Sequence, residues 1–108
     1  MWGKHQQQVD AWIQAHGGYW EDWALLARMA EELGEVAGAL QRLKGLRPRP
    51  EEADLAAEVG DLLFILCAFA NATHIDLDQA FARTLAKYNA RDSAAWQAQA
   101  RPAASKKA

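Results

Sequence analysis

The chain has 108 residues, of which 51% are hydrophobic and 24% are charged, and this composition predicts a globular protein with a single domain. A net charge of −2 with scattered lysines and arginines argues against DNA or RNA binding, which usually needs a clustered basic face. The single cysteine, Cys67, the lack of an apolar N-terminal segment and a longest apolar run of only 62–70 predict a cytoplasmic protein without a disulfide, signal peptide or membrane span.

Apolar residues recur at helical spacing along almost the whole chain, so the predicted fold class is all-α, a bundle of four helices. The first helix is expected over 6–16, and the glycine pair 17–18 ends it. The second helix is expected over 22–44, where one stripe is rich in leucine, and Gly45 ends it.

The third helix is expected from Pro50 to about Asn71. A proline presets the backbone angle for a first helical turn, and Glu51 and Glu52 suit the positive end of the helix dipole. From Leu62 onward the segment is apolar on all sides, which predicts the central, buried helix of the bundle.

A fourth helix is expected over 77–91, because Asp76 and Gln79 have the spacing of a capping box at its start. Ser93 is expected to cap a last short helical turn around Trp96. No segment shows the alternating pattern of a strand.

Residues 1–99 are predicted to form the one domain, and 100–108 a disordered tail with nothing to bury. A domain of this size buries only a modest share of its unfolded surface, so association with further copies would stabilise it. Five tryptophans fit either a dense core or faces that receive a partner or a flat ligand.

Two pairs of acidic residues have a helical spacing of three, Glu32 with Glu35 and Glu58 with Asp61. Residues three apart lie on one face of a helix, and both pairs fall within the apolar pattern. If the two helices pack antiparallel, the four carboxylates meet within about 4–6 Å, where each close pair costs about 3–4 kcal/mol. Because a small domain has only about 5–15 kcal/mol of stability, we expect a divalent cation between them.

The ligand types indicate which cation. Di-iron bundles combine glutamates with Glu-x-x-His motifs, and the acidic pairs of this chain include no histidine. Oxygen ligands alone favour Mg²⁺ or Mn²⁺, and Mg²⁺ usually completes its shell with water and substrate phosphates, which points to phosphoryl chemistry. Gly34 and Gly60, inside the two motifs, are expected to let a third helix approach closely.

The motifs Glu31-Glu32-x-x-Glu35 and Glu58-x-x-Asp61-Leu-Leu-Phe resemble the signature of the MazG-like all-α nucleoside triphosphate pyrophosphohydrolases. The resemblance extends to Lys87-Tyr-Asn89-Ala-Arg91-Asp92 and is strongest to the short, single-module YpjD-like branch, over about 17–96. It implies a Mg²⁺-dependent enzyme that hydrolyses (d)NTP to (d)NMP and pyrophosphate, assembled as a homodimer or homotetramer.

The resemblance also implies roles for individual residues. Glu31 matches the leading glutamate of the family, a catalytic candidate that assists a second metal ion or orients water. Lys87 and Arg91 match a basic pair that meets the phosphates, and Asn89 a contact with sugar or phosphate. The implied metal ligands are the four acids of the two pairs, Glu32, Glu35, Glu58 and Asp61.

The chain departs from the family pattern before its second acidic pair and carries two aromatic residues before its first. Relatives carry a lysine just before the acids of the third helix, whereas here Asp54 stands four residues before Glu58, so one phosphate contact of the family lacks a counterpart. Trp20 and Tyr19 precede the first acidic pair and are placed to stack on a nucleobase, with hydrophobic packing as the alternative.

Two other functions fit the sequence. The chain could be a helical oligomerisation module that pairs through tryptophan-rich faces and keeps a vestigial metal site, or a hydrolase of damaged or modified nucleotides in a housecleaning role. Attack at the α-phosphorus is implied by the resemblance, since the residues alone fit attack at the β- or γ-phosphorus equally well. The base, the sugar and the choice of dimer or tetramer stay open.

Overall fold

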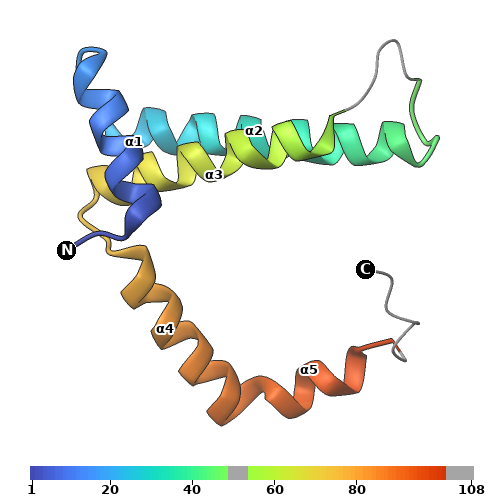
Figure 1. Ribbon diagram of the computed structural model, residues 1–108. Coiled ribbons are helices and arrows are strands. Elements are labelled where there is room, and N and C mark those ends of the chain that lie inside the picture. Colours follow the sequence, from blue (N-terminus) through green and yellow to red (C-terminus); the bar gives the residue numbers. More distant parts are fainter. Residues whose placement is uncertain (49–53, 102–108) are drawn as a thin grey trace. The chain divides into compact units, whose positions relative to one another are not determined.

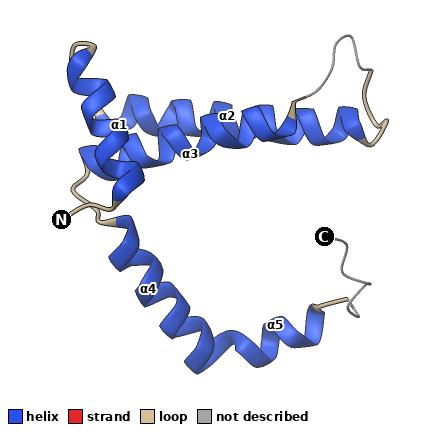
Figure 2. Ribbon diagram, in the orientation of Figure 1, coloured by secondary structure: helices blue, strands red, loops and turns tan. Residues whose placement is uncertain are grey.

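In a computed structural model, the structure describes residues 1–48 and 54–101, and these are helical with no strand among them (Figure 2). The all-α fold with four main helices is confirmed. The chain divides into two compact units, Met1–Leu77 and Asp78–Ala108, each of which is described by itself. The elements in chain order are α1 (Lys4–Ala15), α2 (Asp22–Leu43), α3 (Leu55–Ala72), α4 (Leu77–Lys87), a π-helical turn η1 (Tyr88–Asp92) and α5 (Ser93–Gln99).

The first unit is built on α2 and α3, which run antiparallel along one another, with α1 across the end where α2 begins and α3 ends (Figure 1). One buried hydrophobic cluster joins the three helices at that end. Half-buried Tyr19, Met29 and Leu62 pack around it. The buried members of the cluster are Val9, Ile13, Leu25, Ile65, Cys67 and Ala68.

Local signals set the helix ends. Gly17 and Gly18, with φ of 106° and 100°, end α1, and Gly45, with φ of 77°, follows α2, in conformations that glycine adopts without strain. The predicted start of the third helix at Pro50 lies outside the described residues. The helix that is described begins at Leu55, where the Asp54 side chain caps it by accepting a 3.0 Å hydrogen bond from the backbone N–H of Ala57.

Helix α3 is central, as predicted, because it packs on both α1 and α2. It is not buried on all sides, however: Leu63 and Phe64 are 42% and 36% exposed. By length and hydropathy alone α3 could cross a membrane. Its packing against two neighbouring helices, together with the charges of Glu58 and Asp61, makes it the core helix of this unit.

A polar cluster buried at the end of this core ties distant parts of the chain together. The Gln6 side-chain amide donates to Asn71 Oδ1 (2.9 Å) and to the carbonyl of Ile75 (2.7 Å), and its Oε1 accepts from the backbone N–H of Leu77 (2.8 Å). Asn71 Nδ2 in turn donates to the carbonyl of Gln6 (3.0 Å) and to the Tyr19 hydroxyl (3.1 Å). Both amide side chains are only 2% exposed, so we name this group the amide clamp.

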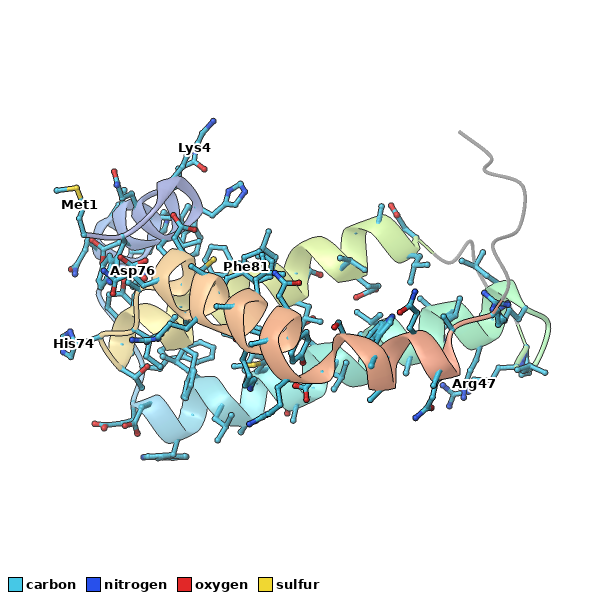
Figure 3. The ribbon with its side chains drawn as sticks, turned by 90° about the horizontal axis from the view of Figure 1, so that it is seen from below. Met1, Lys4, Arg47, His74, Asp76 and Phe81 are labelled. Atoms are coloured by element: carbon cyan, nitrogen blue, oxygen red, sulfur yellow. The ribbon has the colours of Figure 1, made fainter. Side chains whose placement is uncertain are left out.

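The edge of the amide clamp carries a charge. The Tyr19 hydroxyl donates a hydrogen bond to the carboxylate of Asp10 on α1, and burial together with this carboxylate raises the pKa of Tyr19 to about 12. The phenol therefore stays protonated at neutral pH and keeps donating. Nearby, the N-terminal amino group of Met1 lies 3.8 Å from Asp76 Oδ2 (Figure 3).

The second unit differs from the sequence prediction. The α-helix expected over 77–91 ends at Lys87, and the chain continues through the π-helical turn η1 directly into α5. Ser93 has helical angles (φ −62°, ψ −40°) and is the first residue of α5 rather than a cap. The predicted disordered tail falls mostly on 102–108, outside the described residues, and the single domain over 1–99 stays a prediction.

We predict that Asn71→Ala lowers the free energy of unfolding by about 1–3 kcal/mol, because it leaves polar atoms of the amide clamp without partners inside the core. The melting temperature should fall by about 4–8 °C for each kcal/mol, as measured by thermal and urea unfolding followed by circular dichroism. Gln8→Ala, on the exposed side of α1, is the matched control. Equal stability of the two variants would contradict this role.

Candidate functional site

Three of the four predicted metal ligands converge between α2 and α3. One carboxylate oxygen each from Glu32, Glu58 and Asp61 lies within 4.8 Å of the others. The antiparallel packing causes this, because Glu32 on α2 lies level with Glu58 and Asp61 on α3. We call these three residues the acidic triad. Glu32 and Glu58 are half-buried and Asp61 is exposed.

Glu35, the fourth predicted ligand, lies outside the acidic triad. It follows Glu32 by three residues on α2 and is exposed. Its negative charge nevertheless reaches the site, since Glu35 is the strongest electrostatic influence on Glu58. The structure thus groups three carboxylates closely and keeps the fourth within electrostatic range.

The carboxylates repel one another, as the sequence led us to expect. The pKa of Glu58 is raised above its ordinary value, first because the group is partly withdrawn from water and then because Glu35, Asp61 and Glu32 surround it with negative charge. The positive charge of Arg42 acts in the opposite direction. In the absence of a bound cation the ionised form of Glu58 is therefore disfavoured.

One cation of the chain already contacts the acidic triad. Arg28 Nε lies 2.7 Å from Glu32 Oε2, one helical turn earlier on α2. The Arg28 side chain is 48% exposed and that of Glu32 is 12% exposed. Arg28 precedes Glu32 by four residues, a spacing at which side chains on one helix are neighbours.

The acidic triad fits a divalent metal ion. Its ligand atoms are carboxylate oxygens only, which suit hard cations such as Mg²⁺ or Mn²⁺ rather than zinc or iron. The exposure of Asp61 leaves one side of the triad open to water and to a phosphate group. Mg²⁺ sites in nucleotide-processing enzymes commonly join one or two carboxylates to substrate phosphates in this way.

Comparison with known proteins identifies the family. A model of the MazG nucleotide pyrophosphohydrolase domain matches residues 21–96. The protein YpjD of Bacillus subtilis is 38% identical over 95 residues, covering 84% of this chain and 86% of YpjD. The chain belongs to the MazG nucleotide pyrophosphohydrolase family. The family match includes the acidic triad and makes the protein a hydrolase.

Two solved structures support the family membership of this chain. The crystal structure of YpjD from Bacillus subtilis matches with a TM-score of 0.71 and 36% identity, covering 82% of this chain and 99% of that one. The crystal structure of a Bacillus-conserved MazG protein, a nucleotide pyrophosphohydrolase, matches with a TM-score of 0.70 and 35% identity, covering 85% and 97%. At these identities the likeness extends beyond the fold to the family.

The predicted phosphate-binding residues of this MazG-family protein lie in its second unit. Lys87 ends α4, with its Nζ 5.6 Å from the centre of the Tyr88 ring. Asn89 and Arg91 lie in η1, and Arg91 Nε is 3.2 Å from Asp92 Oδ1. π-Helical turns occur often at functional sites, and the sequence carried no signal that distinguished this turn from a continuous α-helix. Contact of these residues with substrate stays a prediction.

The remaining candidates, Glu31 and Trp20, lie in the first unit with the acidic triad. Glu31 is exposed and adjoins Glu32 without joining the triad. Trp20 is 55% exposed and lines a mostly apolar groove of about 270 Å³ that also includes Trp12 and Phe64. Trp12 meets Phe64 edge to face, with ring centres 5.5 Å apart. Phe64 follows Asp61 by one helical turn, so the groove begins beside the acids, and sequence reasoning missed both Trp12 and Phe64 as lining residues.

The glycines of the two acidic motifs do not act as predicted in the part of the chain that is described. A Cβ built on Gly34 or Gly60 meets nothing within 4 Å. Within the described residues of the first unit, therefore, no third helix approaches either glycine closely.

We predict that Glu58→Gln raises the melting temperature of the metal-free protein at pH 7. The pKa of Glu58 is raised by folding, so the folded state holds the proton more tightly than the unfolded state, and its ionised carboxylate opposes folding above the raised pKa. The gain should disappear below about pH 4, where the carboxyl is protonated in both states. Thermal melts in EDTA across this pH range measure the effect.

The control for this prediction is Glu21→Gln, which removes one negative charge from the exposed start of α2. It should show no comparable gain at pH 7. A Glu58→Gln protein that is less stable than the wild type at pH 7 would contradict the assignment of repulsion.

Proposed function

We propose that the protein hydrolyses nucleoside triphosphates, (d)NTP + H2O to (d)NMP + pyrophosphate, with Mg²⁺ as cofactor and Mn²⁺ as an alternative. The observation that carries this proposal is the convergence of carboxylate oxygens from Glu32, Glu58 and Asp61 within 4.8 Å in a chain of the MazG family. Attack at the α-phosphorus follows from the family, whose members are pyrophosphohydrolases.

The acidic residues have distinct parts in this proposal. Glu32, Glu58 and Asp61 hold the ion, and Glu35 completes the ligand set from the next turn of α2. A bound divalent ion would supply activation of water and neutralisation of the triphosphate charge. Glu31, exposed beside the triad, orients the attacking water or assists a second ion.

The basic residues of the second unit have a separate part in this proposal. Lys87 and Arg91 bind the phosphates and neutralise charge that develops in the transition state. Asn89, between them, donates to a phosphate or sugar oxygen. The proximity of all three in and beside η1 supports their acting together on one ligand.

The nucleobase would lie in the apolar groove beside the acids. Trp20 forms one wall of this groove, and Trp12 and Phe64 provide further aromatic surface. Two residues that line the groove, Leu25 on α2 and Ile65 on α3, lie seven residues along their helices from Glu32 and Glu58, respectively. Seven residues correspond to about 10 Å of helical rise. That separation suits a nucleotide whose base lies in the groove while its phosphates reach the triad.

A homodimer or homotetramer is the assembly that we propose, acting in the cytoplasm as a housecleaning enzyme for standard or modified nucleotides. Apolar side chains exposed on α2 support association, among them Trp23 at 70% and Leu26 at 53%. Isolated exposed apolar residues are common, but several large ones on one helix indicate a surface that another helix covers.

We predict Mg²⁺-dependent release of pyrophosphate from at least one nucleotide in a screen of standard and modified (d)NTPs. Asp61→Asn should lower kcat/KM at least about 100-fold, since even the loss of a residue that supports a metal ligand commonly costs 10–100-fold. Lys4→Gln, at the exposed start of α1, should retain full activity. A wild-type protein without turnover of any nucleotide would favour an interaction module with a vestigial site.

We predict that the purified protein is a dimer or tetramer by size-exclusion chromatography with light scattering. Leu26→Lys should shift it toward monomer, because a buried ammonium in the interface would lose its hydration. Ala27→Lys, at the neighbouring exposed position, adds the same charge as a control. A wild-type protein that is monomeric at all concentrations would contradict the assembly.

A further inference from the structure

We propose that Arg28 is the built-in counter-ion of the metal-free acidic triad, and that metal binding must displace it from Glu32. This inference rests on the proposed metal site and adds a residue that sets how tightly the site holds its ion. Its basis is the 2.7 Å contact between Arg28 Nε and Glu32 Oε2, on the same carboxylate that lies within 4.8 Å of its partners in the triad.

The surroundings of Glu32 explain why it needs a cation. Its side chain is only 12% exposed, so water offsets its charge poorly, and Glu58 and Asp61 add negative charge nearby. Glu31 and Asp61 also act on Arg28 by their charge. The guanidinium therefore neutralises several acids at once while bonding to one of them.

The spacing of four residues on α2 places Arg28 beside Glu32, but the order of the two residues is not the one that stabilises a helix best. An arginine four residues before a glutamate is the less favourable order for an ion pair on an isolated helix, where the acid is better placed first. The contact is better explained by the carboxylates that α3 brings to the same level. Arg28 thus meets negative charge from α3, through Asp61, as well as from its own helix.

A guanidinium and a divalent ion compete at this carboxylate. While Arg28 bonds to Glu32 Oε2, that oxygen has less capacity to bind an ion, and the positive charge of Arg28 repels any ion that enters. The contact therefore stabilises the metal-free protein and weakens metal binding. By linkage, its loss must destabilise the metal-free state more than the loaded state, and so tighten metal binding.

The test is Arg28→Gln, compared with the wild type and with Lys4→Gln, which makes the same change of charge at a residue that points away from the fold (Figure 3). Mn²⁺ affinity is measured by isothermal titration calorimetry, and thermal melts are recorded in EDTA. We expect the melting temperature of Arg28→Gln to fall by about 2–6 °C. We expect its dissociation constant for Mn²⁺ to fall by about two- to fivefold.

These opposite changes separate a counter-ion from a residue that only supports the helix, whose loss would weaken both stability and metal binding. Arg28→Lys retains the charge and should restore melting temperature and affinity toward the wild-type values. It also serves if Arg28→Gln does not fold. Higher salt should reduce both differences.

The outcomes distinguish this inference from the proposed function. If the wild type binds Mn²⁺ and Arg28→Gln binds it equally or more weakly, the counter-ion role is overturned while the metal site stands. If the wild type binds no Mn²⁺, the metal site fails and the role of Arg28 fails with it. A tighter Mn²⁺ complex in Lys4→Gln as well would reduce the effect to overall charge.

Discussion

Mutual repulsion among carboxylates at one level of the α2–α3 pair is the constraint around which this protein is organised. Antiparallel packing brings Glu32 of α2 beside Glu58 and Asp61 of α3, and Glu35 adds to the field that raises the pKa of Glu58. A fold of this size has little stability to spare for such a cluster. In this member of the MazG nucleotide pyrophosphohydrolase family, the same arrangement is the one that the proposed function assigns to a divalent cation.

The rest of the first unit holds the two acidic helices in register at a distance from the acids. The amide clamp of Gln6 and Asn71 joins α1 to the end of α3 and to the segment up to Leu77. The hydrophobic cluster lies at the same end. Stability is thus concentrated where α1 crosses, and the acids lie farther along the pair, where Asp61 is exposed.

The repulsion among the carboxylates can be reduced by basic side chains of the protein and by a divalent metal ion. Arg28 bonds to Glu32, and Arg42 acts on Glu58 from a greater distance. These side chains moderate the charge of the protein by itself, whereas a divalent ion would neutralise it more completely. In the proposed role of Arg28, the site exchanges some metal affinity for stability of the metal-free fold, and substrate phosphates would add to the hold on the ion.

The sequence by itself determined the helices, their glycine ends and the two acidic pairs, because apolar spacing, left-handed glycines and residues three apart are all local properties of the chain. It also indicated the family through those pairs. Tertiary structure alone decided that three acids converge while Glu35 stays outside, and that Gln6 meets Asn71 across 65 positions. Each of these depends on which side chains two packed helices bring to the same level. The apolar spacing of 77–91 likewise did not reveal the π-helical turn η1, because this turn differs from an α-helical one in its i→i+5 backbone hydrogen bonds.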